Sequence, residues 1–271
     1  MRKTRFLLPA VALAVALSLG LAASSPLSAQ PFANPDVDAS SACAQLPSHA
    51  QLQAALAYAR AQSNGGFNLD MWGTIVNRDG VVCAVAFTGA NRGSQWPGSR
   101  AISAQKANTA NAFSLPQLAL STANLYSAVQ PGGSLYGLQA SNPVDTRIAY
   151  RGDPSDYGQW NDPMVGGRIG GVNVFGGGLA LYGPKGQLLG AIGVSGDSSC
   201  ADHNISWRTR HKLKLDYVPA GVSGDATRPD SIVYDITTPA GLAIGVSAGG
   251  WGHPACSAAA TSIAAGLPVI P

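Results

Sequence analysis

Residues 99–113 form the stretch that most restricts how this chain can fold. They read SRAISAQKANTANAF, without glycine or proline, and follow a Pro97-Gly98 turn from which Ser99 can cap the first turn of a helix. Alanine occurs at positions 101, 104, 107, 110 and 112. Small alanine side chains let another backbone approach the helix closely. We therefore expect this helix to be tightly packed and the rest of the domain to be built around it.

The same predicted helix carries more polar groups than a plain core helix needs. They include Arg100 near its start, Lys106 and Thr109. Buried polar groups of this kind require partners, which are either other parts of the chain or a ligand. The polar face of this helix is therefore the first candidate for a ligand surface.

Hydrophobic periodicity and turn residues predict the other elements. Helices are expected at 48–63, 116–129 and 201–211, and strands at 72–76, 81–87, 176–182, 188–194 and 231–236. Asp79-Gly80 between the first two strands is a strong hairpin signal, and residues 183–186 form a second turn. This order predicts an α+β fold, in which an antiparallel sheet of two hairpins is flanked by helices.

Residues 130–175 differ in composition from their surroundings. They are rich in Gly, Pro, Asp and Asn, with Tyr and Trp interspersed, and the aromatic residues argue against disorder. We therefore expect a long, ordered functional or interface loop. The predicted organisation is a signal peptide at 1–29, a leader at 30–47, a domain at 48–215 with this insertion, and a Pro/Gly-rich C-terminal extension at 216–271.

The N-terminus has the three parts of a secretory signal. Basic residues precede an apolar run over 6–23, and small residues and prolines follow, with cleavage expected after Ala29 or, as the alternative, after Ser24. A membrane anchor is the competing interpretation, because about 18 apolar residues approach the length of a span. The small residues and prolines after the run favour cleavage, so we expect a periplasmic or secreted protein.

Charge excludes two classes of partner. The formal net charge is +3, but residues 1–29 hold three basic and no acidic residues, which leaves 14 of each sign in the mature chain. No electrostatic signature of nucleic-acid or anionic-membrane binding remains. Only 11% of the residues are charged, a composition that suits a homo-oligomer.

The four cysteines all lie in the predicted mature chain. They are Cys43, Cys83, Cys200 and Cys256. An even number in an exported chain predicts two disulfide bonds, for which three pairings are open.

Sequence motifs give little support to catalysis. Residues 245–249 match the letters of a GxSxG nucleophile elbow, but a Gly-rich segment follows where the elbow needs a helix, and no carboxylate lies downstream. The chain also offers no paired carboxylates or activated nucleophile. We therefore do not expect an enzyme.

Two features could serve a cofactor. His203, Trp207 and His211 fall on one stripe of the last predicted helix, which could present an imidazole to a metal or a macrocycle; a packing stripe is the alternative. Gly177 and Gly178 at a strand start would let a flat ligand approach the backbone, or would form a strand bend.

Several stretches together resemble the haem-binding or haem-degrading GlcG/HbpS-like family. They are the hairpin TIVNRDGVVCAVAF, the helix SRAISAQKANTANAFS, and GGLALYGPKGQLLGAIGVSGDSSCADH. The family typically shows a D-x-x-G hairpin, KA-x-TA in a helix, a GG-[PLI] strand, and G-x-GVSG before a last helix with an acidic start. These motifs correspond here to 77–80, 106–110, 177–179, 190–196 and Asp202. The resemblance covers residues 48–212, interrupted by the insertion.

The resemblance implies an α/β/α-type domain, usually oligomeric, with haem as the expected cofactor. The resemblance itself transfers no axial ligand; as a hypothesis we place the ligand on a face that comprises Arg100, Lys106, Thr109, Gly177, Gly178 and His203. Lys106 or Arg100 would pair with a propionate. His203 or Thr109 would approach the iron, and His203 is the stronger metal-ligand candidate because histidine is a common haem ligand.

The chain departs from the family at three features. Asn77 stands where the family often has Asp, the middle loop is enlarged, and four cysteines and a C-terminal extension are added. An alternative function is that of a non-catalytic, oligomeric interaction module of the cell envelope.

Overall fold

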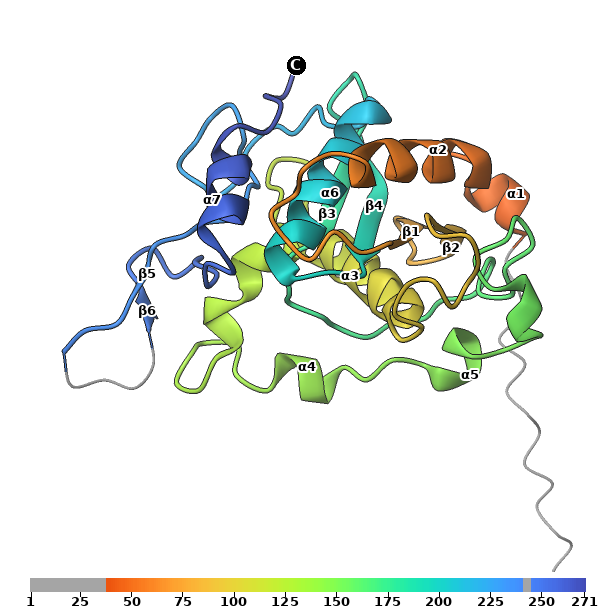
Figure 1. Ribbon diagram of the computed structural model, residues 1–271, viewed down its shortest axis with the longest axis horizontal. Coiled ribbons are helices and arrows are strands. Elements are labelled where there is room, and N and C mark those ends of the chain that lie inside the picture. The colour runs from red at the N-terminus through yellow and green to blue at the C-terminus, as the bar shows by residue number, and fades with distance from the viewer. Residues whose placement is uncertain (1–37, 241–244) are drawn as a thin grey trace, which may run out of the picture. The chain divides into compact units, whose positions relative to one another are not determined.

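A four-stranded antiparallel sheet organises the computed structural model, which describes residues 38–240 and 245–271 (Figure 1). The predicted signal peptide lies outside the described residues. The elements, in chain order, are α1 (Ala39–Ala42), α2 (His49–Arg60), β1 (Trp72–Asn77), β2 (Val82–Phe87), α3 (Ser99–Phe113), η1 (Thr122–Leu125), η2 (Ser127–Val129), α4 (Leu138–Ser141), α5 (Thr146–Ala149), η3 (Pro154–Asp156), β3 (Gly178–Tyr182), β4 (Leu188–Ser195), α6 (Ser199–Lys212), β5 (Ile236–Thr237), β6 (Val246–Ser247) and α7 (Ala258–Ala265). In this described part, no helix is both long and apolar enough to cross a membrane.

The sheet consists of the two predicted hairpins, joined side by side. Its strand order is β2-β1-β4-β3, and the central pair β1–β4 runs from Trp72 opposite Ser195 to Asn77 opposite Gly190. Helices pack on both faces, which confirms the predicted α+β fold.

The first hairpin turn is held by the asparagine that departs from the family pattern. The Asn77 side chain accepts hydrogen bonds from the amides of Asp79 and Val81, each at 2.9 Å. Gly80 supplies the positive φ of 74° that closes the turn. An aspartate oxygen makes the same contacts, so the departure leaves the turn intact.

Helix α3 packs on one face of the sheet as closely as its alanines predict. Ala101, Ala104, Ala107 and Ala110 are at most 6% exposed. A Cβ atom on Gly193 of β4 would lie only 1.9 Å from the carbonyl oxygen of Ser103, so glycine is required where the helix crosses the strand. The alternating residues Trp72, Val76 and Ala191 share this core with the helix.

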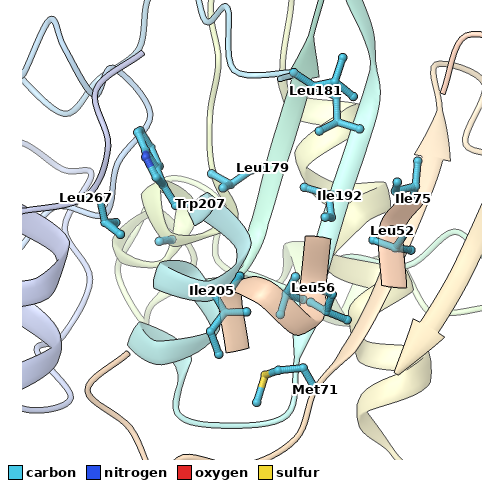
Figure 2. Close-up of a cluster of buried hydrophobic side chains, with 14 of the residues drawn as sticks. Leu52, Leu56, Met71, Ile75, Leu179, Leu181, Ile192, Ile205, Trp207 and Leu267 are labelled. Carbon is cyan, nitrogen blue, oxygen red and sulfur yellow. The ribbon is translucent and has the colours of Figure 1, made fainter. Parts of the chain in front are cut away.

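Helices α2 and α6 cover the opposite face (Figure 2). Leu52 and Leu56 of α2 meet Ile75 of β1, Ile192 of β4 and Ile205 of α6 there. A capping box between Ser48 and Gln51 starts α2. The two faces of the sheet thus hold separate apolar clusters, as the period of two in a β-strand requires.

Two predicted elements are wrong. Residues 116–129 do not form one α-helix: the amide of Ala119 donates to the carbonyl of Ala220, and only the 3₁₀ turns η1 and η2 follow. The strand predicted at 231–236 is reduced to a single bridge at Val233 and to β5, which begins at Ile236. In the first case, pairing of Ala119 with Ala220 replaces the helical hydrogen bonds; in the second, the amide of Ile232 donates to His203 Nε2 and that of Ser231 to the carbonyl of Arg228 rather than to a strand.

Two disulfide bonds join the domain to its flanking segments, as predicted. Cys43 pairs with Cys83 of β2, and Cys200 of α6 pairs with Cys256 in the C-terminal extension. This settles the pairing that the sequence left open.

Candidate functional site

Lys106 of α3, a predicted propionate partner, lies in the interior. Its Nζ donates to Asp202 Oδ2 of α6 at 2.8 Å and to the carbonyl oxygen of Val194 in β4 at 3.1 Å. Both charged side chains are at most 3% exposed. The ammonium therefore joins three elements and already has an anionic partner.

The environment of Asp202 balances two opposing effects. Burial raises the pKa of this carboxyl to about 6, while Lys106 and the amide of Asp197, which donates to Oδ1 at 2.8 Å, favour the ionised form. This acid is the acidic helix start that belongs to the family pattern, and here it holds Lys106.

Arg100, the other predicted propionate partner, is also buried and paired. Its Nε donates to Asp162 Oδ2 at 2.9 Å, its second terminal nitrogen contacts the same carboxylate, and Nη1 donates to the carbonyl of Ala149 at 2.6 Å. Asp162 also accepts the amides of Gly158 and Met164 at 2.6 and 2.8 Å. The inserted loop thus folds around the guanidinium of Arg100.

Thr109 contacts the same insertion further along α3. Its hydroxyl donates to Gln105 O and accepts the amide of Asn173, at 2.8 and 2.9 Å. Asn108 donates to the carbonyl of Gly171 at 2.8 Å. The insertion runs beside α3 in Figure 1 and supplies the hydrogen-bond partners of its outer polar face.

Gly177 and Gly178 serve close packing between parts of this chain. A Cβ on Gly177, whose φ is +118°, would lie 2.3 Å from Val194 O and 3.2 Å from Lys106 Nζ. A Cβ on Gly178 would lie 2.5 Å from Lys106 O. The space that a flat ligand would need along this backbone is filled by α3 and β4.

His203 lies fully buried on α6. Its Nε2 accepts the amide of Ile232 at 3.1 Å, so the neutral ring carries its proton on Nδ1, which has no partner among the described residues. Burial, assisted by the charge of Arg210, lowers the pKa of His203 to about 3. The other two residues of the stripe also contact the C-terminal extension: Trp207 donates to Pro268 O, and His211 contacts Asp216.

The structure brings only part of the predicted ligand face together. Lys106 and Gly177 are neighbours, and a Cβ on the adjacent Gly176 would lie 3.1 Å from that of His203. Arg100 instead lies at the start of α3, bound to the insertion. The contacts give all of these residues structural partners, and their roles toward a cofactor stay predictions.

A cleft of about 660 Å³ opens at the start of α3. Its walls are aromatic: Trp72 of β1, and Tyr150 and Tyr157 of the insertion. The guanidinium of Arg100 lies 3.6 Å from the centre of the Tyr157 ring and fixes that wall. The volume is within the range of small-molecule sites.

The cleft also offers the exposed guanidinium of Arg92 as a hydrogen-bond donor. Arg92 is exposed along its edge and makes no hydrogen bond or ion pair with the residues that the structure describes. Trp72 lies at the base of the cleft but is only 1% exposed, so it offers a ligand little surface. Tyrosine rings beside an exposed guanidinium suit a planar ligand that carries an anionic group.

Sequence reasoning missed Arg92, Trp72 and Tyr150 as site candidates. The available signal was the aromatic content of 130–175, which predicted a functional loop without saying which residues faced a site. The proximity of that loop to residues 91–98 depends on tertiary contacts.

Comparisons with known proteins identify one family that matches most of the domain. A family model described as "Haem degrading protein HbpS-like" matches residues 47–209. No curated protein matches the chain significantly.

Three solved structures are similar to the chain. The crystal structure of a PduOC:heme complex is 23% identical, with a TM-score of 0.42, over 62% of this chain and 93% of that chain. Klebsiella pneumoniae protein ORFY is 25% identical, with a TM-score of 0.41, over 61% of this chain and 87% of that chain. The crystal structure of HbpS is 14% identical, with a TM-score of 0.38, over 61% of this chain and 86% of that chain.

Proposed function

This chain belongs to the family of HbpS-like haem-degrading proteins, and from that premise we propose that it is an exported protein that binds haem or a related tetrapyrrole. The observation that carries the proposal is the family match over residues 47–209, which span the whole sheet, α3 and most of α6. Haem handling is the property of the family; its assignment to this chain is the proposal.

The cleft beside α3 fits a tetrapyrrole better than the buried face around Lys106 does. The buried face around Lys106 and Gly177 has no room beside the backbone, and its cation is paired. The aromatic cleft beside α3 has flat walls and an unpaired guanidinium. A bound haem would supply an iron centre for redox or ligand chemistry, while the chain would bind the ring, orient it and exclude water from one face.

Export is supported by two observations. The first 29 residues have the composition of a secretory signal. The described residues contain two disulfide bonds, which persist in oxidising compartments.

Titration of the mature, oxidised protein with hemin tests the proposal. We expect a saturable Soret band shifted from that of free hemin. A spectrum that matches free hemin at every protein concentration would contradict it.

Individual exposed aromatic side chains favour one second candidate, an oligomeric interaction module. Trp160 on the insertion is 80% exposed and Tyr136 is 68% exposed, and large exposed aromatic residues are typical of contact surfaces. This function predicts a stable oligomer without ligand. Size-exclusion chromatography with light scattering would contradict it by showing a monomer throughout.

A further inference from the structure

We propose that the cleft at the start of α3 is the ligand site, and that Arg92 pairs there with a carboxylate of a planar, aromatic ligand. The inference rests on the proposed function, since a haem-like ring with carboxylates is the ligand class in question. The new element is the place where the ligand binds. The site lies between β1, residues 91–98 and the insertion, apart from the buried face around Lys106.

The walls of the cleft are suited to a flat ring. Tyr157 is held from behind by Arg100, which is itself fixed by Asp162. Tyr150, also in the lining, is 59% exposed, so its ring is accessible to a ligand. A tyrosine ring that is already held in place loses little conformational entropy when another ring stacks on it.

The charges at the cleft select an anion. Arg92 is exposed at the edge of the cleft and makes no hydrogen bond or ion pair with the described residues, so its guanidinium is available to an anionic group of a ligand. The first amides of α3 do not add to this, because those of Ser99 and Arg100 donate to the carbonyls of Trp96 and Pro97.

One acid opposes this selection. Asp153 precedes η3 beside the cleft, and its pKa is lowered mainly by hydrogen bonds from Ser155 and also by the charge of Arg92. Removing this carboxylate should therefore strengthen the binding of an anion, while removing Arg92 should weaken it.

Gly98 allows the cleft to be blocked without disturbing the fold. It lines the cleft, its φ of −63° is compatible with any residue, and a Cβ built on it meets no atom within 4 Å. Gly98→Leu should place a side chain where the ligand binds. Gly266→Leu is the matched control: Gly266 is exposed at the end of α7, its φ is −100°, and a Cβ there has its nearest neighbour at 3.7 Å.

Charge variants test the role of Arg92. Arg92→Gln should weaken binding and Asp153→Asn should strengthen it. Lys185→Gln is the control, because it removes the same charge away from the cleft. The exposed Lys185 lies in the β3–β4 turn, whereas Ser195, which pairs with Trp72, lies at the other end of β4. Melting temperatures would confirm that all variants are folded.

The experiment is a hemin titration of each oxidised variant, read by the Soret band and by quenching of tryptophan fluorescence. We expect Gly98→Leu and Arg92→Gln to raise the dissociation constant by about tenfold or more, and both controls to match the wild type. Wild-type affinity in Gly98→Leu and Arg92→Gln would overturn the location while leaving haem binding intact. Absence of binding in the wild type would instead overturn the proposed function.

Discussion

Lys106 shows how a single buried cation fixes the position of three elements. Its Nζ reaches α6 through Asp202 and β4 through Val194 O. Replacing Lys106 with Met would leave Asp202 buried without its cation, so we expect the free energy of unfolding to fall by about 3–5 kcal/mol. Urea denaturation with the disulfides intact measures this. In the double variant Lys106→Met, Asp202→Asn, we expect part of the loss to be recovered; a stable single variant would contradict the account.

Two buried histidines make stability depend on pH. Burial lowers the pKa of His203 to about 3 and that of His253 to about 4, below the ordinary value of 6.5. The unfolded chain therefore binds more protons below pH 6.5, and each histidine destabilises the fold by up to about 1.4 kcal/mol per pH unit as the pH falls toward its folded pKa. Asp202, whose pKa burial raises to about 6, acts in the opposite direction between pH 6 and 4.

The variant His253→Gln isolates one of these protons. Glutamine can keep the hydrogen bond to Ser199, which His253 makes at 2.8 Å, but does not titrate. We expect the pH dependence of the urea midpoint between pH 6.5 and 4 to be shallower than in the wild type by about one proton. Identical slopes in the two proteins would show that His253 does not titrate as described.

The residue types at the buried positions could be predicted from the sequence, but their partners could not. Arg100, Lys106 and Thr109 were identified as polar residues on an otherwise small helix. Asp162 and Asp202, which pair with the two cations, lie 62 and 96 positions away in the chain, and no local pattern links them.

The folded structure of the insertion depends on Asp162. This carboxylate accepts hydrogen bonds from two loop amides and binds Arg100. Asp162→Asn would leave the guanidinium buried without an anion, so we expect a loss of about 3–5 kcal/mol. Hydrogen exchange should show the loss of protection first in residues 145–170, with β3 and β4 still protected. Uniform exchange across the domain, or none, would contradict this.

Elements whose formation depends on nearby residues could be predicted from the sequence. Elements that depend on contacts with distant segments could not. The helix over 99–113 and the hairpin around Asp79-Gly80 follow from alanine spacing and turn chemistry. The helix predicted at 116–129 failed because Ala119 pairs with Ala220. The cleft could not be predicted, because it forms only where the insertion meets residues 91–98.

The two disulfide bonds connect the flanking segments to the sheet domain. Cys200–Cys256 closes a separation of 56 residues. Chain entropy gives such a crosslink about 4 kcal/mol of stabilisation. We expect the double variant Cys200→Ser, Cys256→Ser to lose much of this in urea denaturation and to expose residues 245–271 to proteolysis. Unchanged stability and proteolysis would show that packing of α7 on α6 suffices.

We propose that this member of the HbpS-like family binds haem in the cleft at the start of α3. Hemin titration of the wild type and of Gly98→Leu, side by side, tests it most directly. We expect a saturable, shifted Soret band for the wild type and about tenfold or more weaker binding for the variant. A wild-type spectrum identical to that of free hemin would contradict the function, and equal affinities would contradict the site.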